Sequence, residues 1–165
     1  MARKVFYSFH YAPDSWRTSQ VRNIGAIEGN RPATDNKWEE VKKGGDKAIQ
    51  TWIDGQLDGR TCTVVLIGSQ TAKRNWIDYE IVKSWNDCKG VLGINIHNLL
   101  DTNSEQSNKG SNPFAHLSLK KDGKSLSSII NSYDPPYKTS KNVYNHIAEN
   151  ISDWIEEAIR IRNRY

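Results

Sequence analysis

A carboxylate and an indole lie four residues apart in the segment NWIDYEI, which contains Trp76 and Glu80. On a helix this spacing places both side chains on one face, about a turn from each other. A fixed carboxylate beside an aromatic wall can bind hydroxyl groups of a ligand or stabilise positive charge that develops on it. The pattern also has a structural explanation, in which Trp76 belongs to the core and Glu80 forms a weak surface pair with Lys83.

A buried strand is expected just before this helix. Residues Cys62 to Ile67 form an apolar run, rich in β-branched side chains, that is typical of a strand buried on both faces. The polar turn GSQT, which includes Ser69, follows the run and supplies hydroxyl groups that could cap a helix beginning near Asn75. Glu80 is therefore expected near the carboxyl end of a strand, where open α/β sheets bind ligands.

A second buried strand is expected at Val91 to Ile96, directly after the helix. A strand, a helix and a strand within about thirty residues form a βαβ unit, whose strands are parallel and whose crossover is right-handed. His97 and Asn98 follow this strand, so they are expected on the same rim of the sheet as Ser69.

The remaining segments complete an α/β pattern. The expected elements are a strand at Lys4 to Phe9, a helix at Ser15 to Ile27, a loop at Glu28 to Lys37, a helix capped by Asp46, a long functional loop at Leu99 to Lys124, an edge strand at Ser125 to Ile130 and a helix at Lys141 to Arg160. No second strand is evident before Asp46. This order predicts one three-layer, flavodoxin-like domain over residues 1–165, with a mostly parallel central sheet.

Composition limits the classes of function. The chain has 165 residues, of which 36% are hydrophobic and 25% charged, enough for one sizeable core. Its net charge of +4 is spread along the sequence, which suits an anionic small molecule better than a nucleic acid. The sequence contains no apolar run near the ~20 residues of a membrane span, so no membrane contact is expected.

Cysteine and histidine usage indicates a reduced protein without a metal site. The two cysteines, Cys62 and Cys88, form no CxxC pair, and the first residues show no secretory signal. We therefore expect free thiols in a cytoplasmic protein. The four histidines are scattered through the sequence, which argues against a zinc site.

Three blocks of the sequence resemble a known family. KVFYSFHY, VVLIGSQTAKRNWIDYEI and KGSNPF, in this order and spacing, resemble the bacterial TIR-like domains of the Thoeris antiphage defence system. The resemblance implies a TIR-like, flavodoxin-like fold and cleavage of NAD at its nicotinamide glycosidic bond. It also implies a cyclised ADP-ribose product that activates a separate effector, a phage-derived trigger and a possible homo-oligomer.

The resemblance also assigns roles to residues. The family's catalytic glutamate corresponds to Glu80, and the loop that forms part of its nucleotide pocket corresponds to Ser8, Phe9 and His10. The full predicted substrate-binding set is Ser8, Phe9, His10, Ser69, Trp76 and Asn112, with Tyr11 and Phe114 as further aromatic side chains near the rim. NAD is expected as the substrate, and no other cofactor is implied.

Two other functions fit parts of the pattern. A TIR-like module that acts by self-association would need Glu80 only as surface charge and Trp76 only as core. An unrelated flavodoxin-like binder such as a response regulator would need an acidic cluster at the strand ends, which Asp14 alone does not make.

Overall fold

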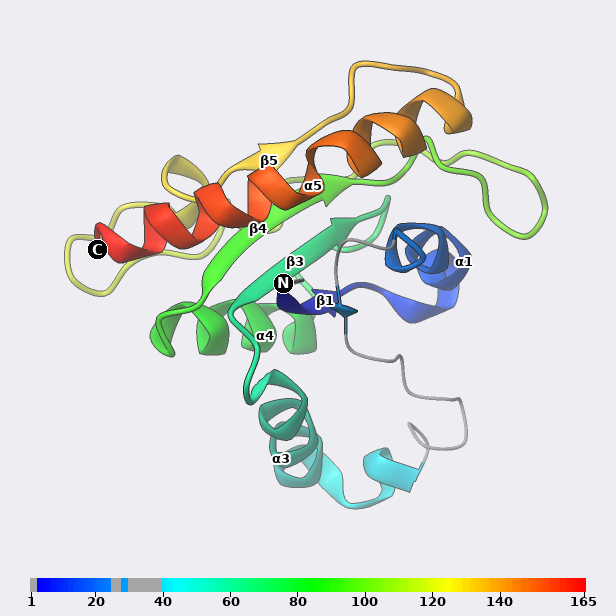
Figure 1. The fold of residues 1–165 in the computed structure, drawn as a ribbon. Coiled ribbons are helices and arrows are strands. Elements are labelled where there is room, and N and C mark those ends of the chain that lie inside the picture. The colour runs from blue at the N-terminus through cyan, green and yellow to red at the C-terminus, as the bar shows by residue number, and fades with distance from the viewer. Residues whose placement is uncertain (1–2, 25–27, 30–39) are drawn as a thin grey trace.

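A parallel five-stranded sheet forms the centre of the computed structural model, which describes residues 3–24, 28–29 and 40–165 (Figure 1). The strand order is β2-β1-β3-β4-β5, and each neighbouring pair is parallel. The strands are β1 (Lys4–Ser8), β2 (Glu28–Gly29), β3 (Cys62–Ile67), β4 (Gly90–Asn95) and β5 (Ser132–Tyr133). The predicted α/β class and the parallel sheet are confirmed.

Helices cover both faces of the sheet, giving the three layers that were predicted (Figure 1). They are α1 (Tyr11–Arg22), α3 (Gly45–Leu57), α4 (Asn75–Asn86), α5 (Ser140–Asn163) and a short 3-10 helix, η1 (Leu126–Ser128). Apolar side chains of α1 and α5 pack on one face, whereas those of α3 and α4 pack on the other.

The side chains of each central strand alternate between these two faces, as the two-residue period of a strand requires. On β1, Val5 and Tyr7 face the α1 and α5 layer, whereas Phe6 packs in the cluster with α3. Ser8 follows the same alternation as Phe6 and is directed to the face that α4 covers. This alternation fixes which polar side chains at the strand ends can meet.

The βαβ unit was predicted closely. Strand β3 has the predicted limits, and all its residues are buried. Helix α4 begins at Asn75 as expected. The expected caps are wrong, however, because Arg74 occupies the cap position without a side-chain hydrogen bond and the Thr71 hydroxyl instead accepts from the Gly68 N–H, at 2.8 Å. Thr71 therefore stabilises the turn between β3 and α4.

Other element predictions need correction. Residues 28–29 form a short second strand beside β1, although too few residues pair for a strand pattern to show in the sequence. The rest of the predicted loop up to Lys37 lies outside the described residues. Helix α3 starts at Gly45 after a Gly44 cap, so Asp46 lies in the first turn instead of capping it.

The segment after β4 also differs from the prediction. Residues 126–128 form a 3-10 helix, because the Ser125 side chain accepts a hydrogen bond from the Ser127 N–H. The edge strand follows at Ser132–Tyr133. Phe114 was expected near the rim, but it is fully buried in the core cluster that includes α4, and it packs beside Gly93 of β4.

Candidate active site

Ser8 and Glu80 meet at the carboxyl end of β1. Ser8 is the last residue of that strand, and Glu80 lies in the middle of α4, which packs across the same face. The Ser8 hydroxyl donates a hydrogen bond to Glu80 Oε2. The predicted neighbourhood of these two residues, which are far apart in the sequence, is therefore present in the structure.

The pKa of the Glu80 carboxyl lies well above that of an ordinary glutamate. Burial raises its pKa to about 8, although the hydrogen bond from Ser8 acts in the opposite direction. The side chain as a whole is only half-buried, so it can still meet a ligand. A carboxyl with a pKa near neutrality, at a strand end, is a physical mark of a functional site.

Glu80 does not form the surface pair with Lys83 that a purely structural role would require. The Lys83 ammonium pairs with Asp87, with Nζ 3.0 Å from Oδ2, one turn further along α4. Glu80 is directed instead toward the sheet and Ser8. Surface pairing with Lys83 therefore does not account for Glu80.

Trp76 is part of the wall between α4 and α3. Its half-buried ring meets Tyr79 edge-on, with ring centroids 5.8 Å apart, and it packs against the cluster formed by Phe6, Ile49, Ile53 and Leu57. The indole therefore contributes to the core while part of it remains exposed. Both predicted roles of Trp76, as packing residue and as apolar wall, are compatible with this position.

His10 lies where α1 begins, close to the start of α4. Burial lowers the pKa of the half-buried His10 imidazole, and the positive charge of Arg74 lowers it further. His10 Nδ1 is buried, and no residue in the described part of the chain forms a hydrogen bond with it. A neutral imidazole with an unused nitrogen can donate to or accept from a polar ligand.

The other predicted residues lie around the rim at different positions. Phe9 packs against the cluster on the α1 and α5 face, opposite to Glu80. Ser69 is exposed in the turn after β3. Asn112 is also exposed, and its Oδ1 accepts a hydrogen bond of 2.9 Å from the Phe114 N–H. The structure thus joins Ser8 to Glu80 but does not bring Phe9 to them.

A close backbone contact connects the Asn112 loop to the turn that contains Ser69. A Cβ atom at Gly110 would lie 2.1 Å from the Gly68 carbonyl oxygen, so only glycine permits this approach. The KGSNPF block therefore lies against the carboxyl end of β3, as part of the rim.

An ion pair buried in α1 was missed by sequence reasoning. Arg17 Nη1 lies 3.0 Å from Asp14 Oδ1, and both side chains are almost fully buried. Arg17 Nε also donates to the Leu99 carbonyl at 2.8 Å. The sequence did contain an indication of buried polar side chains. Helix α1 lacks a continuous apolar stripe, so a helix packed on the sheet with this sequence must bury some polar residues.

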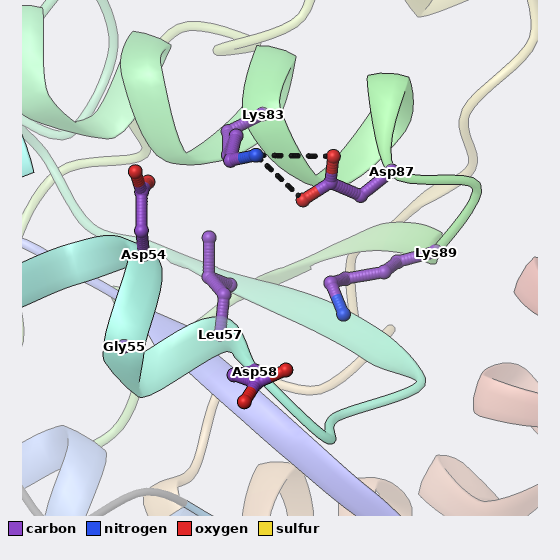
Figure 2. A pocket seen from close by; sticks show the side chains of 7 residues that line it. All are labelled: Asp54, Gly55, Leu57, Asp58, Lys83, Asp87 and Lys89. Atoms are coloured by element: carbon purple, nitrogen blue, oxygen red, sulfur yellow. Dashed lines mark hydrogen bonds and ion pairs between the residues drawn. The ribbon is translucent and has the colours of Figure 1, made fainter. Parts of the chain in front are cut away.

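A separate cavity of about 370 Å³ lies between the C-terminal turns of α3 and α4 (Figure 2). It is lined by Asp54, Gly55, Leu57, Asp58, Lys83, Asp87 and Lys89. Lys83 is paired with Asp87, and Lys89 Nζ donates to the Arg60 carbonyl at 2.6 Å. Both cations that line the cavity are thus engaged, so it offers no ready anion site.

Metal-binding clusters and membrane-spanning helices are both absent from the described part of the chain. Within residues 3–24, 28–29 and 40–165, no three His, Cys, Asp or Glu side chains are arranged to hold a metal ion. No described helix is both long and apolar enough to cross a bilayer.

Comparison with known proteins identifies the family. A family model described as "Thoeris protein ThsB, TIR-like domain" matches residues 6–101. The chain belongs to this ThsB TIR-like family. A Bacillus cereus (strain MSX-D12) relative named "Putative cyclic ADP-D-ribose synthase ThsB1" is 39% identical over 133 residues, which cover 76% of this chain and 69% of the relative.

The region matched by the ThsB TIR-like family contains the central part of the candidate site. Residues 6–101 include Ser8, Trp76 and Glu80, as well as strands β3 and β4. Asn112 and the Gly110 contact lie beyond that region. The resemblance predicted from the three sequence blocks is confirmed at the level of the family.

Proposed function

We propose that this chain cleaves NAD between nicotinamide and ribose and closes the remaining ADP-ribose into a ring. The observation that carries the proposal is the Glu80 carboxyl, buried against Ser8 at the carboxyl end of β1. Membership of the ThsB TIR-like family and the reaction named for the Bacillus cereus relative support it. NAD is then the substrate, and no further cofactor is proposed.

The first step breaks the glycosidic carbon–nitrogen bond. The bonding electron pair leaves with nicotinamide, which departs neutral and needs no proton. The ribosyl carbon left behind carries positive charge like that of an oxocarbenium ion. Ionised Glu80 would stabilise this charge or hold a ribose hydroxyl, and a partly buried position strengthens either interaction.

The second step decides the product. Attack by water on the ribosyl carbon gives linear ADP-ribose, whereas attack by a hydroxyl or an adenine nitrogen of the same molecule gives a ring. A hydroxyl that attacks loses its proton, whereas a ring nitrogen attacks with its lone pair. A well-placed internal nucleophile can reach an effective molarity of ~10⁵ M or more, far above that of bulk water.

The cyclised product would act as a signal between proteins. We propose that it diffuses to a separate effector and activates it, and that a phage-derived trigger switches on the chain itself. Self-association of the chain is part of the same proposal.

Replacing one carboxylate tests this function. Glu80→Gln keeps the shape of the side chain and removes its charge, so it should abolish nicotinamide release in lysates of phage-infected cells that express the protein. Glu149→Gln on the exposed side of α5 is the matched control and should behave as the wild type. Chromatography of free nicotinamide is the measurement, and full activity of the Glu80 variant would remove this residue from the mechanism.

A further inference from the structure

Helix α1 buries a polar face against the segment that follows β4. Its buried residues are Asp14, Arg17, Thr18 and Val21. Arg17 donates to the Leu99 and Glu105 carbonyls, at 2.8 and 2.9 Å. We call this contact between α1 and residues 97–107 the α1 seam.

Four buried polar atoms on the two sides of the α1 seam have no hydrogen-bond partner among the described residues. Asp14 Oδ2 and Thr18 Oγ1 lie on α1, and His97 Nδ1 and Ser107 Oγ lie on the segment opposite. His97 and Ser107 are close together, because the Ser107 N–H donates to the His97 carbonyl at 2.9 Å. A buried polar group without a hydrogen-bond partner destabilises a fold, so each of these atoms marks a place where a polar ligand would complete a hydrogen bond.

The charges in the α1 seam favour a neutral ligand. The Arg17 guanidinium donates to the Asp14 carboxylate and to the carbonyls of Pro13, Leu99 and Glu105, and its Nη2 also lies 3.8 Å from Asp101 Oδ2, so carboxylates already balance its charge. Lys109 near the seam pairs with Asp134, at 3.0 Å. Burial lowers the pKa of His97, so its imidazole is neutral near pH 7. One carboxylate oxygen, two hydroxyls and an imidazole nitrogen suit the hydroxyl groups of a sugar better than a phosphate.

The α1 seam lies on the same edge of the sheet as Glu80. Ser8 is in register with Val65 of β3, and the Asp14 carboxylate lies against Gly68, where a Cβ atom would meet Oδ2 at 2.0 Å. Val65 and Gly68 are three residues apart, which corresponds to ~10 Å along a strand. A ligand with two sugars joined by a flexible linker could therefore reach both places.

We propose that the α1 seam binds the ribose that carries adenine, while Glu80 binds the ribose that carries nicotinamide. This assignment rests on the proposed function, because that function supplies a substrate with two riboses. Asp14 Oδ2 would accept from the ribose hydroxyls, and Thr18 and Ser107 would complete their hydrogen bonds.

Entry to the α1 seam requires residues 100–107 to separate from α1. Two side chains of α1 hold this segment by hydrogen bonds to its main chain. Arg17 donates to the Leu99 and Glu105 carbonyls, and Gln20 Nε2 donates to the Leu100 carbonyl at 2.8 Å. Leu99 is fully buried in the core, so it forms a fixed end about which the segment can move.

Thr18→Val is the decisive variant, because valine has nearly the shape of threonine but no hydroxyl group. The full chain is titrated by calorimetry with AMP, which has only the adenosine ribose, and with nicotinamide mononucleotide, which has only the other. We expect Thr18→Val to weaken AMP binding at least fivefold without changing the affinity for nicotinamide mononucleotide. Because it removes an unsatisfied hydroxyl, the variant should also raise the Tm of the ligand-free protein.

Other results would overturn the ribose assignment. Unchanged AMP affinity in Thr18→Val means that the seam is a structural contact, and a lower Tm with unchanged affinity means that water satisfies Thr18. Absence of AMP binding by the wild type also overturns it. Ser107→Ala provides a second variant with the same expected loss, and Thr51→Val, on the exposed side of α3, is the control.

A measurement of nicotinamide release shows whether a failure lies in the ribose assignment or in the proposed function. If the function is right and the seam binds ribose, Thr18→Val raises KM for NAD and leaves kcat nearly unchanged. If triggered wild-type protein releases no nicotinamide, the proposed function fails, whereas the AMP titration still decides whether the seam is a sugar site.

Discussion

A single hydrogen bond joins the two residues on which the proposed chemistry depends. Ser8 stabilises the ionised form of Glu80, whereas burial stabilises the protonated form, and burial is the larger effect. At pH 7 most Glu80 side chains are therefore protonated before NAD binds. The ionised fraction, which the mechanism needs, grows as the pH rises.

The first prediction concerns the pH profile of this residue. Because the pKa of Glu80 is about 8, kcat/KM for nicotinamide release should rise about tenfold per pH unit below that value and level off above it. Ser8→Ala removes the bond that lowers the pKa, so the rising limb should move to higher pH and activity at pH 7 should fall. Steady-state kinetics from pH 6 to 9 provide the measurement.

The control for this profile is Ser19→Ala, which removes a hydroxyl bonded to the Ser15 carbonyl on α1. Its profile should match that of the wild type. If Ser8→Ala lowers activity by the same factor at every pH, Ser8 positions Glu80 without tuning its pKa.

Residue-level prediction succeeded where a local pattern carried the signal. The four-residue spacing of Trp76 and Glu80 was visible in the sequence, and the carboxyl end of β1 could be located from its aromatic run. The burial of Asp14 Oδ2 and Thr18 Oγ1 without a hydrogen-bond partner among the described residues could not be predicted, because it depends on the path of the segment after β4. That path is set by Arg17 and by hydrogen bonds to main-chain carbonyls, which leave no trace in residue spacing.

At the level of the elements, two aromatic side chains of α4 hold it against α3: Trp76 through packing, and Tyr79 through packing and a 2.7 Å hydrogen bond to Asp54. Truncating Trp76 to alanine removes the ring that packs on Phe6 and Tyr79. Because the ring is half-buried, the loss of unfolding free energy should lie near the lower end of the range for aromatic truncation, ~3 kcal/mol. The Tm should fall by ~6–12 °C, as measured by thermal unfolding.

Trp16→Ala is the control for Trp76, because Trp16 is 51% exposed on α1. Its Tm should change by less than ~2 °C, in line with the small effect of most surface substitutions. A Trp76→Ala protein with the stability of the wild type and no activity would show that the indole contacts substrate without supporting the fold.

A glycine sets the distance between the Asn112 loop and the turn after β3. A Cβ atom at Gly110 would meet the backbone of Gly68 and Ser69, so Gly110→Ala must displace the loop from this turn. We expect more linear and less cyclised ADP-ribose, because the displaced loop lets water reach the ribosyl carbon. The product ratio is measured by mass spectrometry, in which the linear product is heavier by one water.

Gly55→Ala is the matched control, since a Cβ atom at that position in α3 meets no atom of the described residues within 4 Å. It should keep the product ratio and gain ~0.5–1 kcal/mol of stability from better helix propensity. An unchanged ratio in Gly110→Ala would show that the Asn112 loop does not control access of water.

Element prediction worked best where burial was uniform along a segment. The continuous apolar run of β3 and the helical period of α4 left little choice of structure, so the limits of β3 and the start of α4 were predicted correctly. Residues 28–29 and 126–128 are too short for a period to show, and each is held by a neighbour: β1 in one case and the Ser125 hydroxyl in the other. Such tertiary and side-chain contacts are invisible in a pattern of residue types.

For the molecule as a whole, the principal prediction is that a product carries the signal. A protein-free filtrate of triggered wild-type reactions with NAD should activate a purified effector of the same defence system. The filtrate of Glu80→Gln reactions should not, because no ribosyl centre forms. A wild-type filtrate that contains only linear ADP-ribose would reduce the proposed activity to hydrolysis of NAD.

Helix α5 has a consequence for synthesis of the protein on the ribosome. It is 24 residues long and supplies Val143, Ile147, Ile151, Ile155 and Ala158 to the cluster that covers Leu92 and Ile94 of β4 and Ile96 just after it. At ~5–20 residues per second, translation of this helix alone takes ~1–5 s. During that interval the nascent chain exposes one apolar face of its central strands, so chaperones that bind such surfaces should associate with it until α5 has emerged.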